Sequence, residues 1–268
     1  MTRAPEGLPA LDAALAEMRA AGVRRLVVEG GDGTVREVMS RAFTLWAGSP
    51  PEFAILAAGN SNLIARSAGR IEEADLDRLI AANGARRRAL AVLRVARARA
   101  PEIRGFVLGA GAYVAATRLA REEIGARHGP QIVLAVLRLL RSKALRAPSS
   151  IGFGCDGAPD EPRQRMLVGL TSLPGALIYG LEPFWGGGDG AIRWLDIAAD
   201  APRLMLAAPF VAFGAPRRWM RGGYESGRAA RATLALDAPF VMDGEEFEAG
   251  ADGRIEVTAA ESATFLSF

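Results

Sequence analysis

The chain has 268 residues, of which 50% are hydrophobic and 24% are charged. A chain of this length and composition buries a sizeable core, which excludes a disordered or fibrous protein. Its one cysteine, Cys155, excludes an internal disulfide. Together with the single histidine, His128, this lone cysteine argues against zinc sites made of His and Cys clusters. The single histidine also argues against histidine-dependent catalytic triads.

Arginine dominates the basic residues, since only Lys143 among the 33 is a lysine. No glycine loop precedes Lys143, which excludes a GxxxxGK[ST] phosphate-binding loop. The arginine bias has two explanations, a GC-rich genome or a surface that meets anionic lipid or phosphates. The longest uncharged run, residues 166–181, is too short for a membrane span. No secretory signal is recognisable, so we expect a soluble, cytoplasmic protein.

Helices and strands are expected to alternate over residues 1–83. The predicted elements are helices over 8–18 and 35–45 and strands over 24–28 and 53–57. Thr34 and Glu37 have the spacing of a capping box at the start of the second helix. A third helix is expected to open at residues 59–62. This alternation is typical of a parallel, doubly wound α/β unit.

The remaining chain, residues 84–268, is expected to be rich in β structure. A strand over 88–99 and a helical stretch over about 113–143 come first. Short β runs follow at 150–154, 165–172, 175–181, 191–198, 229–236, 239–242, 254–258 and 263–267. Gly, Pro and Asp turns separate them, as in a sandwich or barrel. The sequence therefore predicts two domains, residues 1–83 and 84–268.

The first segment that carries chemistry joins a buried strand to a helix. It consists of Gly30, Gly31, Asp32, Gly33 and Thr34. Three glycines leave backbone N–H groups bare at the positive end of a helix, where a polyphosphate binds well. An aspartate there repels phosphate unless a divalent cation lies between them, so the pattern implies Mg²⁺. The alternative is a tight strand-to-helix turn.

Two later segments have the same ambiguity. Gly59, Asn60 and Asn62 follow the next strand and would face the same crevice as the glycine loop, or would serve only to cap a helix. Asp243 and Glu245 flank a glycine, either as a hairpin turn or as two acids facing one cation or one substrate hydroxyl.

In this order, the segments resemble the diacylglycerol kinase catalytic-domain family, which includes sphingosine kinases and, more distantly, NAD kinases. Its pattern is a GGDGT loop, a strand ending in P-x-G-T-x-N-x-x-A-R and a β-rich half that closes with D-G-E. The counterparts here are residues 30–34, 57–66 and 243–245. Residues 183–196 are similar to the family's D-D-G-L-L-D-V stretch.

The resemblance implies an ATP- and Mg²⁺-dependent lipid kinase that phosphorylates a hydroxyl of diacylglycerol or a related long-chain lipid. It also implies an active site in the cleft between the two domains. The GGDGT loop would hold the ATP phosphates, with Asp32 near the metal. Glu245 is the first choice for the general base and Asp243 the second, and the two roles are exchangeable. A second, structural metal site is expected at Asp189 with the carbonyl of Ala191.

Two rival functions remain open. One is a catalytically impaired relative that binds lipid or nucleotide, because nothing matches the family's first Asn-Pro-x-Ser-Gly loop and residues 108–113 contain no acid. The other, which is less favoured, is a soluble nucleotide kinase. For the lipid kinase we expect peripheral contact with an anionic inner membrane face. Arg217-Arg218-Trp219-Met220-Arg221 and the apolar, partly basic stretch 131–146 fit such contact, or else ordinary packing. A homodimer is possible, and no nucleic acid partner is expected.

Overall fold

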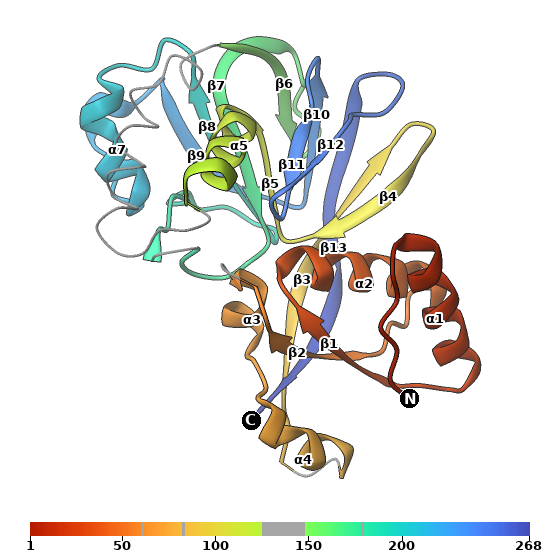
Figure 1. The fold of residues 1–268 in the computed structure, drawn as a ribbon. Helices are drawn as coiled ribbons and strands as arrows, with labels where there is room; N and C mark the ends of the chain where they lie inside the picture. The colour runs from red at the N-terminus through yellow and green to blue at the C-terminus, as the bar shows by residue number, and fades with distance from the viewer. Residues whose placement is uncertain (60–61, 82–83, 125–147, 178–179) are drawn as a thin grey trace. The chain divides into compact units, whose positions relative to one another are not determined.

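The computed structural model describes residues 1–59, 62–81, 84–124, 148–177 and 180–268. It divides into two compact units, Met1–Val92 with Glu261–Phe268 and Leu93–Ala260. Two strands, β3 (Arg86–Arg97) and β13 (Arg254–Ser267), run through both units (Figure 1). The units therefore differ in extent from the predicted domain ranges, because the end of the chain returns to the first unit.

The first unit alternates helices with parallel strands. Its elements are α1 (Leu8–Ala20), β1 (Arg25–Gly30), α2 (Asp32–Leu45), β2 (Glu52–Ala57), α3 (Leu63–Ala68), a 3-10 turn (Glu73–Asp75), α4 (Leu76–Ile80) and the ends of β3 and β13. Helix α2 packs against both β1 and α1. The first unit is thus the α/β layer that the alternating pattern predicts.

The last residues of the chain complete this parallel sheet. β1 pairs with β2 in parallel, and β2 pairs in parallel with β13, where Phe265 lies opposite Phe53. The two phenylalanine rings are fully buried, with centroids 5.8 Å apart. A strand more than 200 positions further along the chain therefore stabilises the N-terminal layer.

The second unit is built mainly from antiparallel strands. Its elements are β4 (Ala100–Gly105), β5 (Val107–Gly111), α5 (Ala112–Ile124), β6 (Ser149–Cys155), β7 (Pro162–Thr171), β8 (Ile192–Ala198), α7 (Leu204–Ala212), a 3-10 turn (Arg218–Met220), β9 (Tyr224–Ala229), β10 (Arg231–Leu236), β11 (Phe240–Met242) and β12 (Glu245–Phe247), with parts of β3 and β13. The strand order is β13-β10-β6-β7-β5-β11-β12, and β8 and β9 continue from β7.

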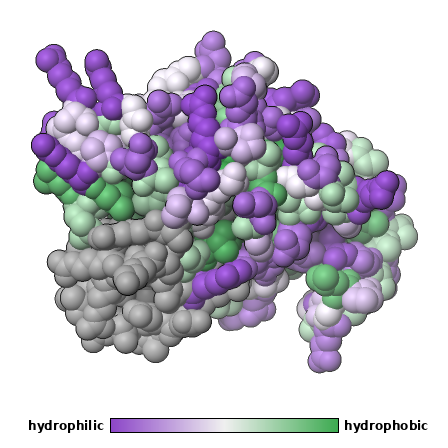
Figure 2. Space-filling model, turned by 90° about the horizontal axis from the view of Figure 1, so that it is seen from above, coloured by the Kyte–Doolittle hydropathy of each residue, from purple (hydrophilic) through white to green (hydrophobic). Residues whose placement is uncertain are grey.

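Two apolar cores support the second unit. The larger lies on the sheet and includes Leu108, Val168 and Phe240. The smaller lies between α7 and the strands β8 and β9, around Ala207 and Met220. The predicted β-rich second half is confirmed, and the helix α7 is an addition that the sequence pattern did not indicate. Figure 2 shows hydrophilic surface over much of the viewed face and hydrophobic surface at its left edge, the side on which Figure 1 places α7.

Several local predictions were wrong. The described residues of the stretch 175–181 form no strand. Helix α2 begins at Asp32 with Gly31 as its N-cap and has no side-chain cap, so the expected capping box of Thr34 and Glu37 is not formed. Most of the stretch 131–146 and of the expected helix 113–143 lies outside the described residues. No helix in the described parts of the chain has the length and apolar character needed to cross a membrane.

Candidate phosphate-binding loop and acidic hairpin

The glycine loop joins β1 directly to α2. Gly30 ends the strand with φ of +159°, and a Cβ at this position would lie 2.7 Å from Cβ of Thr34. Any larger residue at position 30 would therefore push the threonine and the start of the helix aside. Because no side chain caps α2 within the described residues, its first backbone N–H groups suit an anionic ligand.

The second motif lies against the first through two glycines. A Cβ on Gly59 would lie 2.5 Å from Cα of Gly31, closer than unbonded carbon atoms approach. The backbone N–H of Ala58 also donates a hydrogen bond to the carbonyl of Gly30, at 3.1 Å. The structure thus brings together the two loops that follow neighbouring parallel strands, as predicted for the carboxyl edge of such a sheet.

Asp32 connects the glycine loop to the third helix. Its Oδ2 accepts a hydrogen bond from the N–H of Leu63 and its Oδ1 one from the N–H of Ile64, each at 2.9 Å. These are orphan donors at the start of α3, whose own N-cap residue, Asn62, makes no side-chain cap. Asp32 therefore caps α3 from a distant part of the sequence, a role that sequence reasoning did not assign to it.

Asn62 closes its own loop. Its Oδ1 accepts a hydrogen bond from the N–H of Gly59 at 3.0 Å, and its Nδ2 donates to the Gly59 carbonyl at 2.5 Å. The backbone of Asn62 is left-handed, with φ of 46°. The side chain thus shapes the loop that was predicted to touch nucleotide. Asn60, the other predicted contact, lies outside the described residues.

The acidic segment forms the turn of a hairpin between β11 and β12. Asp243 and Gly244 both have positive φ, 47° and 86°, as in a type I′ turn. The hairpin interpretation is therefore confirmed, which leaves open a further chemical role for its acids. Glu245 begins β12 opposite Met242 and is half-buried.

The Asp243 carboxylate holds the turn between β4 and β5. Its Oδ1 accepts a hydrogen bond from the N–H of Val107 at 2.8 Å, and its Oδ2 one from the N–H of Phe106 at 3.0 Å. The Asp243 N–H in turn donates to the Val107 carbonyl at 2.8 Å. A Cβ on Gly105 would lie only 2.3 Å from Oδ2. Only glycine at position 105 therefore leaves room for the Asp243 carboxylate.

Tyr113 is a neighbour of the hairpin that sequence reasoning missed. It lies in the first turn of α5, and a Cβ on Gly109 would be 2.1 Å from its Cγ, so the ring packs directly on that glycine. Burial, with a smaller contribution from the charge of Asp243, raises the pKa of Tyr113 to about 12. A glycine four residues before an aromatic at a strand-to-helix junction is the signal that could have indicated this packing.

The predicted second metal site is not assembled from several acids. Asp189 is exposed and precedes β8, next to Ala191. No group of three or more acidic, His or Cys side chains suited to a metal ion occurs among the residues that the structure describes. Asp189 with the Ala191 carbonyl therefore stays a prediction.

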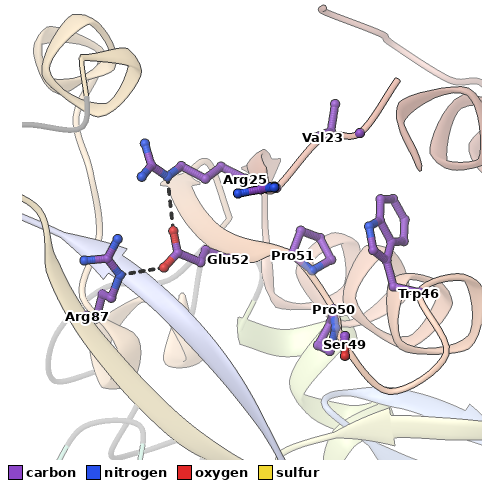
Figure 3. Close-up of a pocket in the computed structure, with 10 residues that line it drawn as sticks. Val23, Arg25, Trp46, Ser49, Pro50, Pro51, Glu52 and Arg87 are labelled. Atoms are coloured by element: carbon purple, nitrogen blue, oxygen red, sulfur yellow. Dashed lines mark hydrogen bonds and ion pairs between the residues drawn. The ribbon is translucent and has the colours of Figure 1, made fainter. Parts of the chain in front are cut away.

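A cavity of about 730 Å³ lies at the opposite edge of the N-terminal sheet, where β1 and β2 begin (Figure 3). Glu52 pairs there with Arg25 at 3.1 Å and with Arg87 at 2.5 Å. Burial opposes the ionised form of Glu52, but the hydrogen bonds from the two arginines outweigh it and lower its pKa. The glycine loop follows the carboxyl end of β1, so this cavity does not belong to the candidate site.

Comparison with known protein families supports the assignment of the first two motifs, residues 30–34 and 57–66. Residues 5–95 match the family model of the diacylglycerol kinase catalytic domain, which confirms the resemblance predicted from the sequence. Comparison with curated protein sequences gives no match.

Two solved structures of Bacillus anthracis proteins assigned as diacylglycerol kinases share the fold. One has a TM-score of 0.67 at 16% identity and covers 97% of this chain and 83% of its own. The other has a TM-score of 0.62 at 14% identity, with coverage of 97% and 82%. At these identities the likeness concerns the fold, a two-domain α/β architecture.

Proposed function

We propose, from the match of residues 5–95 to the diacylglycerol kinase catalytic domain, that the protein transfers the γ-phosphoryl group of ATP to a hydroxyl of diacylglycerol or a related long-chain lipid. That match is the observation that carries the proposal. The local geometry supports it, because the interlocked glycines and the uncapped start of α2 suit a polyphosphate.

The donor side of the reaction is assigned to the first unit. Gly30, Gly31 and Gly33 let phosphate oxygens approach the backbone N–H groups, and Thr34 offers its hydroxyl. Mg²⁺ would be held by Asp32 together with the phosphates, since Asp32 lies in the first turn of α2, at the glycine loop, and carboxylate oxygen is a ligand that this ion prefers. When bound, the ion would neutralise phosphate charge.

The acceptor side is assigned to the acidic hairpin. We assign the general base to Glu245 in preference to Asp243, because the Asp243 carboxylate has a structural role in fixing the turn between β4 and β5. The lipid hydroxyl oxygen forms a bond to the γ-phosphorus while the bond from that phosphorus to the bridging oxygen breaks. ADP leaves, and the hydroxyl proton passes to Glu245. An impaired relative that only binds its ligands is the alternative function.

The experiment is transfer of labelled phosphate from ATP to diacylglycerol, ceramide and sphingosine in mixed micelles. We expect one lipid to be labelled, and Glu245→Gln to lower the rate by about 10²- to 10⁴-fold, as for loss of a general base. Glu248→Gln is the matched control, since Glu248 lies in the same segment but is exposed. Calorimetric ATP binding without transfer to any lipid would favour the impaired relative, and no ATP binding would overturn both functions.

A further inference from the structure

Helix α7 is an apolar helix on the surface of the second unit. Its sequence, LMLAAPFVA, contains no polar side chain. One side packs on the smaller core, with Ala207 fully buried and Leu204, Phe210 and Val211 partly buried against it. A surface helix normally carries polar residues on its other side, and this helix carries none.

The outer side of α7 exposes large apolar side chains. Met205 is 37% exposed, Leu206 52% and, just after the helix, Phe213 65%. Leu181, 37% exposed, lies in the segment that is hydrogen-bonded to the end of the helix through Glu182 and Ala212. Four of the eight large hydrophobic residues that are exposed among the described residues thus lie in or next to α7. Such clustering marks a binding surface, whereas scattered exposed residues do not.

Positive charge predominates in the segment that contains α7, although the acids Asp200 and Glu225 flank it and Glu182 lies beside the end of the helix. Residues 201–224 contain four arginines and no acid. The four, Arg203, Arg217, Arg218 and Arg221, are all exposed. Two are held against aromatic rings, with the guanidinium of Arg217 4.6 Å from the Phe210 centroid and that of Arg203 5.9 Å from the Trp219 centroid. Their positions beside the helix are therefore partly fixed before any ligand binds.

A cavity of about 480 Å³ adjoins the same helix. It is lined by Met166, Ala199, Ala201, Arg203, Leu204, Met205 and Leu206. Apolar side chains thus surround a recess that contains a single cation. An aqueous anion would not need the apolar lining, and a neutral apolar ligand would not need the arginine.

We propose that α7 and the arginines beside it, residues 203–221, form the surface by which the protein binds an anionic phospholipid bilayer. The apolar side chains would enter the interface between headgroups and acyl chains, and the arginines would meet lipid phosphates. The charge complementarity favours this occupant over a second copy of the chain, whose identical arginines would face each other across a symmetric contact. The inference rests on the proposed function only in expecting a membrane-bound substrate.

The test is sedimentation of the full chain with vesicles, without nucleotide, so that its outcome is independent of kinase activity. We expect binding to vesicles of phosphatidylcholine with 30 mol% phosphatidylglycerol, and much weaker binding to phosphatidylcholine alone or at high salt. Arg217→Glu with Arg218→Glu should weaken binding by at least about 30-fold, from about 1 kcal/mol for each arginine removed. Leu206→Glu with Phe213→Glu should weaken it by at least about tenfold.

Matched variants elsewhere separate this surface from a general effect. Leu8→Glu alters a leucine that is 50% exposed on α1, and Arg19→Glu with Arg70→Glu changes the net charge as much as the first pair does. Both should bind like the unmodified protein, and thermal melts establish that every variant is folded. The proposal is overturned if the unmodified protein binds no vesicle, if the controls lose as much binding as the α7 variants, or if Phe213→Glu instead abolishes a dimer in sedimentation equilibrium.

Discussion

The carboxylate of Asp32 accepts a hydrogen bond from the backbone N–H of Leu63 at 2.9 Å, although 30 residues separate the two in the chain. A second such bond comes from Ile64. One side chain thus joins the glycine loop to the start of α3 and satisfies two of the helix's orphan donors. The aspartate of this motif has a structural role whether or not a metal ion binds beside it.

Replacing Asp32 should therefore destabilise the protein even without nucleotide or Mg²⁺. We expect Asp32→Ala to lower the free energy of unfolding by about 2–4 kcal/mol, because two amides lose a charged acceptor. Asp32→Asn should cost about half as much, since one carbonyl oxygen remains. Urea denaturation in EDTA measures both values. Asp77→Ala, at an exposed acid of α4, is the control. Wild-type stability of Asp32→Ala in EDTA would mean that Asp32 serves a ligand alone.

The contact between Gly31 and Gly59 predicts a second effect. Gly59→Ala would place a Cβ 2.5 Å from backbone that cannot move freely, so we expect a loss of about 1–3 kcal/mol from overpacking. ATP affinity should fall at least tenfold, because the two loops would separate. Gly187→Ala is the matched control, since no atom lies within 4 Å of a Cβ at that position. Equal ATP affinities of Gly59→Ala and Gly187→Ala would disprove a phosphate site shared by the two loops.

The sequence predicted the parts of this fold that depend on local patterns. The alternation over residues 1–83, the β-rich second half and the Asp-Gly hairpin each follow from periodicity or turn chemistry. The partners of Asp32 and Asp243 could not be predicted, because each carboxylate reaches backbone that is distant in sequence. The pairing of Phe265 with Phe53 could not be predicted for the same reason, since the sequence of a C-terminal strand does not indicate which sheet the strand joins. Helix α7 was missed because its apolar residues show no polar side, and hence no helical period.

The ionisation of Tyr113 supplies a test of its environment. Its pKa is raised to about 12, first by burial and then by Asp243, whereas an unfolded tyrosine titrates near 10. Between these values the folded state binds more protons than the unfolded state, so stability falls as the pH rises from 10 to 12. Tyr113→Phe should show a smaller fall. Denaturant midpoints at each pH measure this fall in stability. If stability decreased with pH equally in the unmodified protein and in Tyr113→Phe, the raised pKa of Tyr113 would be contradicted.

The phenol absorbance gives an independent measure of the same group. In Asp243→Asn the neighbouring charge is gone, so the pKa of Tyr113 should decrease while remaining above its ordinary value, because burial is the larger cause. The chain has three tyrosines, and comparison with Tyr113→Phe isolates the contribution of this one. No change in its titration on removing the Asp243 charge would place the ring away from the hairpin.

Substitutions of the two hairpin acids should differ in their effects on protein stability and on the rate of phosphoryl transfer. Asp243→Ala leaves the N–H groups of Phe106 and Val107 without their carboxylate, so we expect a loss of about 2–4 kcal/mol in unfolding free energy, with activity reduced in proportion to misfolding.

Glu245→Gln keeps the size and position of a half-buried side chain. It should leave the melting temperature within about 1 °C, roughly 0.5 kcal/mol for a chain of this size, while phosphoryl transfer falls by about 10²- to 10⁴-fold. The two acids would exchange roles if Asp243→Asn kept full stability yet abolished transfer and Glu245→Gln remained active. A large loss of stability in both variants would instead make the whole segment a structural turn, because a catalytic carboxylate that is not needed for folding can be neutralised without unfolding the strand that carries it.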